Sequence, residues 1–207
     1  FDKKLVSIGY VIHLNYTNPY VSPFDEFQQF KTHPSVKKVL KGGKRISYGA
    51  RAITTGGYQS VPKLYFPGGA IIGCSAGFLN YPKIKGTHNA MESGMLAAEA
   101  IIDNYISNNQ ENDLTNYQEK YENSRIAKEL KRVRNIKPYQ ARYGVLLGTL
   151  FSGLDMWLST FGITVPFTLG HNKPDHKTLR KASECNEIEY QKPDGKFSFD
   201  KLFSVLL

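Results

Sequence analysis

A glycine-rich segment between a short apolar run and a helical pattern could hold a phosphate-bearing redox cofactor. The run Ala70–Ile72 predicts a buried strand, and Gly73–Gly77 follows it directly. Glycine lets the backbone approach a ligand closely, and the free N–H groups at a helix start attract negative charge. A second helix start at Gly86-Thr87 could stabilise the electron-rich edge of a reduced flavin. Glycine-rich turns are also common connectors, so the spacing alone leaves both interpretations open.

A cationic stretch precedes a long apolar one, and together they could bind an anionic lipid surface. Residues 125–142 contain seven bases and one acid, Glu129, whereas residues 143–169 contain a single charge, Asp155. Spanning a bilayer takes about 20 apolar residues, but a central aspartate costs about 2.5–3.5 kcal/mol to insert. We therefore predict a shallow dip into the membrane surface, as basic helices beside apolar segments make. The predicted membrane contacts are Arg132, Arg134, Leu146, Leu147, Leu150, Phe151, Leu154, Trp157, Leu158 and Phe161.

Two other interpretations of this region stay open: a solvated basic face and a buried core helix. Nucleic-acid binding is not expected, because aromatic residues are not interleaved with the bases and no recognition fold is apparent.

The composition bounds the class of protein. The chain has 207 residues, 41% of them hydrophobic and 22% charged, which excludes disordered and fibrous classes. A net charge of +9 points to anionic partners. Cys74 and Cys185 are too few for a disulfide framework and too far apart for a metal cage, so no metal ligand is expected here. Because the chain starts at Phe1 and stops at Leu207 without a polar tail, we interpret it as an internal piece of a longer protein.

The first third of the chain predicts mostly extended structure. A strand is expected over Lys4–Leu14, and a short helix over Asp25–Phe30 that His33-Pro34 ends. Short alternating runs over Lys41–Phe66, separated by glycine pairs and a proline, predict antiparallel hairpins. In this interpretation Gly42-Gly43 occupies a hairpin turn.

Two helices are expected to follow the glycine-rich segment. The first covers His88–Ser107, and Asn89 with Glu92 resembles a capping box. The polar residues Asn108–Asp113 separate it from a basic helix running from Leu114 to about Ile136, which Pro138 ends. The face of the first helix expected to be in the core carries Met91, Met95, Ala98, Ile102 and Tyr105.

Several strings together resemble the electron transfer flavoprotein–ubiquinone oxidoreductase family, and the resemblance runs over essentially the whole chain. The string Phe66–His88 also resembles the second flavin motif of geranylgeranyl-reductase-like flavoproteins. The other strings are Pro34-Ser35, Gly42–Arg51, Arg134–Pro138 and Tyr190–Asp200.

The resemblance implies FAD as a cofactor. It places Gly73, Cys74, Ser75, Ala76 and Gly77 along the ribityl–pyrophosphate side, and Asn80, Lys85, Gly86 and Thr87 near the isoalloxazine ring. Many related flavoproteins have an aspartate where Cys74 stands, so the ribityl contact would fall to Ser75 or to backbone.

The resemblance also implies that the backbone of Gly42 and Gly43 binds ubiquinone. A neutral quinone needs hydrogen-bond donors at its carbonyls and flat apolar walls, which nearby rings could supply. These rings are Tyr20, Phe24, Phe27 and Tyr48. His33 could donate a proton to the reduced quinone, although a structural histidine is the commoner case. A [4Fe-4S] cluster is implied as well, with its ligands outside this chain.

The implied fold class is α+β. Antiparallel hairpins and helices of a quinone-binding domain join the C-terminal part of a glutathione-reductase-like FAD domain, with a monotopic membrane segment. The expected divisions are 1–66 for ubiquinone binding, 67–113 for the FAD-domain segment, and 114–207 for the basic helix, membrane-surface segment and connection towards an iron–sulfur domain.

The implied function is an oxidoreductase that passes electrons from reduced electron transfer flavoprotein through an iron–sulfur cluster and FAD to membrane ubiquinone. This chain alone is expected to be inactive, and no catalytic acid, base or nucleophile is expected. The implied location is the matrix face of the mitochondrial inner membrane, or the cytoplasmic face of a bacterial inner membrane. Two alternatives stay open: a membrane flavoprotein of the FixC or geranylgeranyl reductase type, and a non-catalytic basic membrane-binding module.

Overall fold

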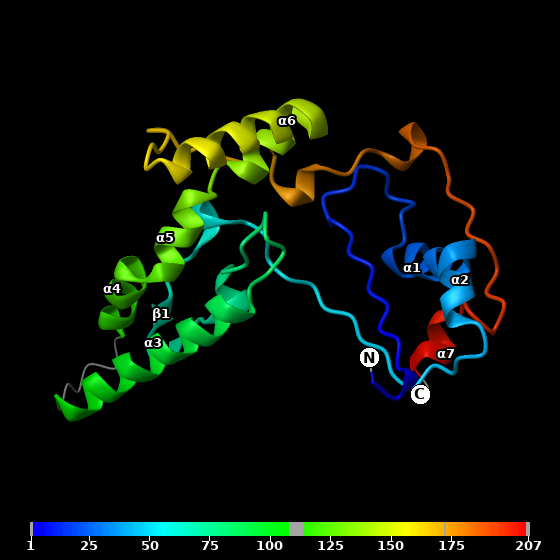
Figure 1. Ribbon diagram of the computed structural model, residues 1–207, viewed down its shortest axis with the longest axis horizontal. Coiled ribbons are helices and arrows are strands. Elements are labelled where there is room, and N and C mark those ends of the chain that lie inside the picture. The colour runs from blue at the N-terminus through cyan, green and yellow to red at the C-terminus, as the bar shows by residue number, and fades with distance from the viewer. Residues whose placement is uncertain (1, 108–113, 172, 206–207) are drawn as a thin grey trace. The chain divides into compact units, whose positions relative to one another are not determined.

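The computed structural model describes residues 2–107, 114–171 and 173–205, which form two compact units (Figure 1). Phe1–Ala50 together with Lys173–Leu207 make up the terminal unit, and Arg51–Asn172 make up the central unit. These bounds differ from those of the three segments expected from the sequence, whose domain roles stay predictions.

Short helices joined by irregular chain build the terminal unit. They are α1 (Pro23–Thr32), α2 (Pro34–Leu40) and α7 (Lys201–Val205), with single 3-10 turns at Asp2–Lys4, Asp175–Lys177 and Ala182–Glu184. The predicted helix at α1 is confirmed. The Ser22 hydroxyl caps it by accepting a hydrogen bond from Asp25 N at 3.4 Å, and Pro23 pre-sets the first helical turn.

Most of the predicted extended structure is wrong for the described residues. Residues 5–14 are irregular, and so are residues 43–57. A strand needs a neighbouring strand for its backbone N–H and C=O groups. Within the part of the chain that the structure describes, the one sheet is the short pair β1 (Tyr65–Phe66) and β2 (Gly69–Ala70), paired antiparallel with Tyr65 opposite Ala70.

In the central unit, a 3-10 turn at Tyr58–Ser60 precedes the two strands, and a second at Gly73–Ala76 leads from β2 towards α3 (Thr87–Ile106). The predicted order of strand, glycine turn and long helix is therefore confirmed. The predicted buried strand Ala70–Ile72 is mostly wrong, because β2 includes only Ala70 of it and Ile72 is 44% exposed. The helices α4 (Thr115–Asn123), α5 (Arg125–Arg132) and α6 (Ile136–Thr160) follow. The predicted polar break at Asn108–Asp113 lies outside the described residues.

Helix α3 confirms the predicted long helix but buries a different face. Its buried residues are small or polar: Asn89, Ser93, Ala97 and Ala100. Met91, Met95 and Tyr105, expected in the core, are 67%, 63% and 86% exposed. The capping box is wrong too, because Gly86 is the N-cap and Asn89 lies within the helix.

The basic helix predicted from Leu114 is interrupted twice. Ser124 is extended between α4 and α5, and its hydroxyl starts α5 by accepting a hydrogen bond from Ala127 N at 3.3 Å. Pro138 does not end a helix but lies in the first turn of α6, where a missing N–H costs no helical hydrogen bond.

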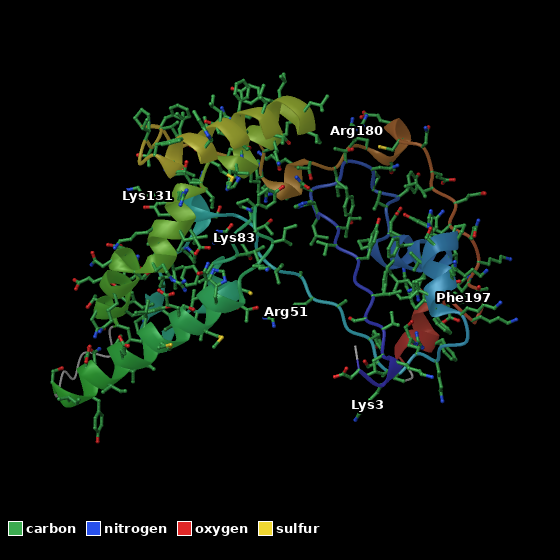
Figure 2. All side chains as sticks on the ribbon, viewed as in Figure 1. Lys3, Arg51, Lys83, Lys131, Arg180 and Phe197 are labelled. Atoms are coloured by element: carbon green, nitrogen blue, oxygen red, sulfur yellow. The ribbon has the colours of Figure 1, made fainter. Side chains whose placement is uncertain are left out.

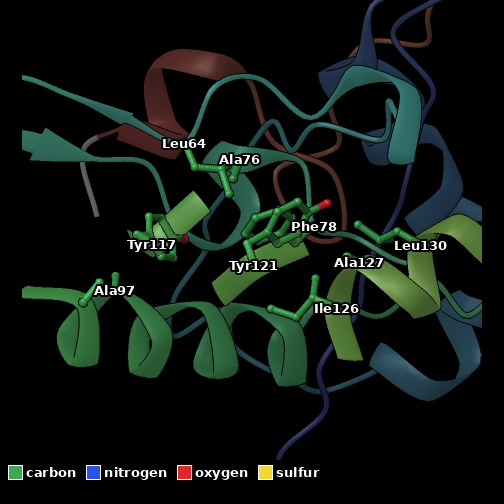
Figure 3. Packing of buried hydrophobic residues seen from close by; sticks show 10 residues of the cluster. Leu64, Ala76, Phe78, Ala97, Tyr117, Tyr121, Ile126, Ala127 and Leu130 are labelled. Atoms are coloured by element: carbon green, nitrogen blue, oxygen red, sulfur yellow. The ribbon is translucent and has the colours of Figure 1, made fainter. Parts of the chain in front are cut away.

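The core of the central unit lies where β2, the glycine turn and α3, α4 and α5 meet (Figure 3). The rings of Phe78 and Tyr121 stack with their centroids 4.9 Å apart. Tyr117 and Ile126 are fully buried beside them. This packing fixes the glycine turn against the first half of α3. The mixture of helices with a small antiparallel sheet agrees with the α+β class.

Candidate functional site

The glycine turn between β2 and α3 is held by contacts to α3. Gly73 and Gly77 have φ angles of +59° and +81°, which other residues rarely adopt. Gly73 N donates to Ser93 Oγ at 3.0 Å, and a Cβ at Gly73 would lie 3.2 Å from the Ala90 Cβ. Gly73 is therefore required for packing on α3 as well as for the turn.

Only some of the five residues predicted along a cofactor's phosphate side are accessible in the structure. Gly73, Ala76 and Gly77 are buried, Cys74 is a half-buried free thiol, and Ser75 is exposed. The side chain that can most readily meet a ligand here is therefore Ser75.

The residues predicted near a flavin ring form a tight loop before α3. Asn80 N donates to Lys85 O at 3.0 Å and Lys85 N to Asn80 O at 3.4 Å, which closes the loop. At its tip Ile84 has a φ of +52°, an outlier for a β-branched residue. Gly86 packs closely on Leu79 and starts α3 without a side-chain cap, and Thr87 is exposed next to it.

One carboxylate from α5 holds this loop. Glu129 Oε1 accepts a hydrogen bond from Asn80 Nδ2 at 2.6 Å and from Lys83 Nζ at 3.2 Å, and His88 Nε2 lies 3.2 Å away. Burial alone would raise the pKa of Glu129, but these three hydrogen bonds outweigh it and lower that pKa below its usual value. The carboxylate is therefore ionised at neutral pH.

Glu129 and its partners Lys83 and His88 were missed in the sequence. The available signal was that Glu129 is the one acid among seven bases in residues 125–142. Asn80 was predicted to approach a cofactor, but it is fully buried, and its side-chain amide donates to Glu129 and accepts from Lys83 N at 3.2 Å. In the structure, the Asn80 side chain therefore stabilises the loop through these hydrogen bonds.

Gly42 and Gly43 end a helix instead of turning a hairpin. Gly42, with a φ of +80°, follows α2, and Gly43 N donates to Leu40 O at 3.0 Å. Both glycines are exposed, with open space where a Cβ of Gly42 would lie. The backbone of both glycines is accessible, as predicted, but they follow the end of a helix and do not form a hairpin turn.

The aromatic rings expected beside these glycines make separate contacts. Phe27 stacks with Tyr10 at a centroid distance of 6.3 Å, and Tyr48 lies 6.0 Å from the Arg45 guanidinium. Arg45 also lies 4.2 Å from the ring of Phe199, a residue far along the chain that local sequence could not connect to it.

Helix α6 is two helices folded on each other (Figure 1). Gly144, with φ +72° and ψ −175°, breaks the helix, and the second segment returns so closely that a Cβ at Gly148 would lie 2.6 Å from Gln140 Cα. Ser152 Oγ donates to Gly148 O at 2.6 Å on the same inner side.

The second segment of α6 buries polar residues and exposes apolar ones, the reverse of a helix on a water-soluble surface. Its buried residues are Gly148, Ser152 and Asp155. Most of the predicted membrane contacts on it are exposed, namely Leu146 (87%), Leu147, Leu150 (65%), Phe151, Leu154, Trp157 (60%) and Phe161, whereas Leu158 is half-buried. A helix on a water-soluble surface places its apolar stripe inward, so this outward stripe marks an interaction surface.

Asp155, the single charge in residues 143–169, lies inside the protein. Its side chain is 7% exposed and hydrogen-bonded to Asn135, close to the Arg134 charge. Burial raises the pKa of Asp155, and the Asn135 hydrogen bond and Arg134 offset part of this effect. The free-energy cost of inserting an aspartate into a bilayer therefore does not apply to Asp155.

Arg134, predicted to contact the membrane, is buried at 9% exposure. Its guanidinium donates to Lys131 O and Val165 O at 2.7 Å each, and to Thr168 Oγ1 at 2.9 Å. It also donates to Phe167 O at 3.3 Å, so four acceptors inside the protein hold this buried guanidinium away from a headgroup, and that prediction is wrong. Arg134 instead fastens the loop after α6 to the end of α5.

Other bases near α6 remain exposed. Lys131 (Figure 2) and Arg132 end α5 on the surface, and Arg132 Nε donates to Ser159 Oγ at 2.9 Å. Arg142 is also exposed and donates to Gly170 O at 3.3 Å. Arg125 is exposed but paired with Glu92 at 2.7 Å.

The described residues include neither a membrane-spanning helix nor a metal-binding cluster. Among residues 2–107, 114–171 and 173–205, each helix is too short or too polar to pass through a bilayer. The same part of the chain contains no group of three or more histidine, cysteine, aspartate or glutamate side chains arranged to bind a metal ion.

The chain is similar to known proteins along its full length. A family model described as "ETF-QO, ubiquinone-binding" matches residues 1–53. The chain is 51% identical over 211 residues to the mitochondrial electron transfer flavoprotein-ubiquinone oxidoreductase of Sus scrofa, covering 99% of this chain and 34% of the relative. It is 49% identical to the mitochondrial protein of Caenorhabditis elegans, covering 99% of this chain and 35% of the relative. It is 50% identical to the Pseudomonas aeruginosa protein of the same name, covering 100% of this chain and 37% of the relative.

The chain thus spans about a third of the length of the curated relatives that it matches. Identity near one half along the whole chain, together with the ubiquinone-binding model over its first quarter, assigns the family. The chain belongs to the electron transfer flavoprotein–ubiquinone oxidoreductase family.

Proposed function

We propose that this chain forms part of an enzyme that passes electrons from reduced electron transfer flavoprotein to ubiquinone at a membrane surface. The observation that carries the proposal is the identity of about one half, over 99–100% of the chain, to relatives that are named for this reaction. Because the chain spans about a third of those relatives, we expect it to be inactive by itself.

The glycine turn and the loop before α3 are proposed to bind FAD. The left-handed Gly73 and Gly77, and a helix start without a side-chain cap, fit a phosphate-bearing cofactor. Asn89 Oδ1 is buried beside the turn without a hydrogen-bond partner among the described residues, and it is an acceptor that a ribityl hydroxyl could satisfy. Bound FAD would supply the redox chemistry, while this chain orients it and excludes water. Gly73–Gly77 would line its ribityl–pyrophosphate side, and Lys85, Gly86 and Thr87 its ring.

The outward face of α3 supports the view that this part is half of a cofactor domain. Met91, Met95 and Ile102 are more than half exposed. An apolar stripe of this length normally packs on another element. We propose that the remainder of an FAD domain, supplied by sequence outside this chain, covers it.

Ubiquinone is proposed to bind at Gly42 and Gly43. The family model for ubiquinone binding covers both glycines. Their backbone is exposed without side chains in the way, and the Gly42 N–H could donate to a carbonyl of a neutral ring, whereas the Gly43 N–H already donates to Leu40 O. Protons for the reduced quinone would come from solvent or a nearby side chain.

The outward apolar segment of α6 is proposed to dock the protein on a membrane without crossing it. Buried Asp155 and Ser152 and exposed Leu146, Leu150 and Trp157 are what an interfacial helix requires. Lys131, Arg132 and Arg142 would meet anionic headgroups. The membrane is proposed to be the mitochondrial inner membrane on its matrix face, or a bacterial inner membrane on its cytoplasmic face, after the two kinds of relative.

The [4Fe-4S] cluster of the proposed electron route would be held by sequence outside this chain. The two cysteines here, Cys74 and Cys185, are separated by 111 positions and neither lies in a cluster motif.

The test compares the complete protein that carries this chain with the chain expressed alone. The complete protein should retain FAD and reduce a short-chain ubiquinone when supplied with reduced electron transfer flavoprotein, and the chain alone should do neither. A complete protein that purifies with flavin but reduces no quinone would exclude the proposed acceptor. One that binds no flavin would exclude the proposed cofactor.

A further inference from the structure

Three side chains from two segments converge on one oxygen of Glu129. Asn80 and Lys83 belong to the loop before α3, and His88 belongs to the first turn of α3 itself. Glu129 lies on α5, about forty to fifty positions further along the chain. The contact therefore fastens the loop from outside.

The Asn80 contact differs from an ordinary surface ion pair. The Asn80 side chain is fully buried and that of Glu129 is 14% exposed, whereas that of Lys83 is 57% exposed. At 2.6 Å the Asn80–Glu129 bond is the shortest of the three, and bonds to an ionised acceptor are about twice as strong as neutral ones. The lysine adds a positive charge beside the oxygen, but the buried Asn80 amide sets the geometry of the contact.

Most of the loop's internal bonds involve Asn80, and another joins Ile84 N to Tyr81 O at 3.1 Å. Its backbone pairs with Lys85 in both directions, and its Oδ1 accepts from Lys83 N at 3.2 Å. The direction in which the Asn80 amide points is set by its bond to Glu129. The carboxylate on α5 thereby fixes the residue around which the loop closes.

The loop also contains a strained residue that needs an outside restraint. Ile84 has a φ of +52° and is 75% exposed, so burial of its own side chain does not hold it there. Left-handed conformations of such residues persist only where surrounding contacts over-determine them. Ile84 N donates to Tyr81 O, and the Tyr81 hydroxyl donates to Gln140 Oε1 at 2.8 Å. The Asn80–Lys85 pairing and its tether to Glu129 restrain the other side of the loop.

We propose that Glu129 is a positioning residue for the redox site, which sets the loop Asn80–Lys85 and with it the ring-facing residues Lys85, Gly86 and Thr87. This inference rests on the proposed flavin function. Glu129 touches neither flavin nor quinone in this role. It acts through Asn80.

The experiment measures amide hydrogen exchange and flavin midpoint potential in the complete protein that carries this chain. In Glu129→Ala, amides of residues 81–85 should exchange roughly tenfold faster or more, the size of effect expected on loss of a charged hydrogen bond. Glu129→Gln keeps an acceptor for Asn80, so its exchange should rise less. Glu119→Gln, an exposed carboxylate on α4, should change neither measurement.

The potential separates positioning from mere stability. Glu129→Gln keeps the loop but removes a negative charge, so its positive shift of the flavin midpoint potential measures the effect of the charge alone, because negative charge disfavours the reduced flavin. Glu129→Ala should change the potential further, because the loop is displaced as well. If Glu129→Ala does not fold, Glu129→Ala combined with Ile84→Gly should restore folding, because glycine adopts positive φ without strain.

The outcomes are distinguishable. Unchanged exchange at residues 81–85 in Glu129→Ala overturns the inference, and so does faster exchange with a flavin potential equal to that of Glu129→Gln. If the wild-type protein holds no flavin, the proposed function fails, whatever the exchange data show.

Discussion

Gly148 lies against the backbone of Gln140, so closely that a Cβ at position 148 would be 2.6 Å from Gln140 Cα and 2.9 Å from its N. This contact lets the two segments of α6 fold on each other. The segment 145–160 then turns Ser152 and Asp155 inward and most of its leucines outward. A single glycine thus sets the orientation of the apolar face that is proposed to dock on lipid.

The first prediction tests this close approach. Gly148→Ala should destabilise the protein by about 1–3 kcal/mol, because backbone atoms, unlike a flexible side chain, cannot move aside easily. Gly153 lies on the same segment with open space around it, so Gly153→Ala should stabilise by about 0.5–1 kcal/mol through helix propensity. Denaturant unfolding of both variants measures the sign of each change in the free energy of unfolding. Equal effects would show that Gly148 is not a contact glycine.

The second prediction concerns the exposed bases that end α5. Lys131→Glu with Arg132→Glu should weaken binding to anionic liposomes at low salt by well over tenfold, because each base near such a surface contributes about 1 kcal/mol. The difference should shrink at high salt, where charges are screened. Arg134 is left out because it is buried and holds the loop after α6.

The matched control for these reversals is Arg51→Glu with Lys63→Glu, which makes the same change in net charge at exposed positions away from α5 and α6. Liposome flotation at two salt concentrations compares the pairs. Equal loss of binding in both would mean that overall charge, not this surface, binds the lipid.

Sequence patterns gave helices more reliably than the faces those helices bury. In α3 the spacing of Met91, Met95 and Ile102 correctly put them on one side, but that side is exposed while Asn89 and Ala97 are buried. Periodicity reports which residues share a face, and the identity of the covering element is a tertiary fact.

The candidate site was predictable where it depends on local backbone and hidden where it depends on distant partners. Gly73 and Gly77 were identified because a turn between a strand and a helix needs glycine. Glu129 was not, because its three partners lie at least forty residues away and no local pattern connects them. Arg134 was misassigned for the same reason, since a basic residue in a basic run gives no local sign that it is buried.

The third prediction tests the quinone role of the exposed glycine after α2. Gly43→Leu should lower quinone reduction by tenfold or more while flavin content stays unchanged, because a bulky side chain would cover backbone that is now open. Gly49→Leu, at an exposed glycine with open space around it in the same unit, should leave the rate near that of the wild type. Steady-state reduction of a short-chain ubiquinone and the flavin absorbance give the two values. Loss of flavin in parallel with activity would refute a quinone role for Gly43.

The last prediction follows from the buried carboxyl of Asp155. Its pKa is raised in the folded protein, mainly by burial, so the folded state holds a proton at pH values where the unfolded chain has already lost it. The contribution of Asp155 to the free energy of unfolding should therefore fall as pH rises from its ordinary pKa of 3.8 through the raised folded value. A salt-bridged aspartate would show the opposite dependence.

The variant Asp155→Asn keeps an oxygen that can accept a hydrogen bond from Asn135 but removes the titrating group. The free energy of unfolding of Asp155→Asn relative to wild type should rise across that pH window and stay constant above it, as followed by denaturant unfolding at a series of pH values. A difference that is flat with pH would show that folding does not shift the pKa of Asp155, and one that falls would show that the folded protein stabilises its carboxylate; either result contradicts the prediction.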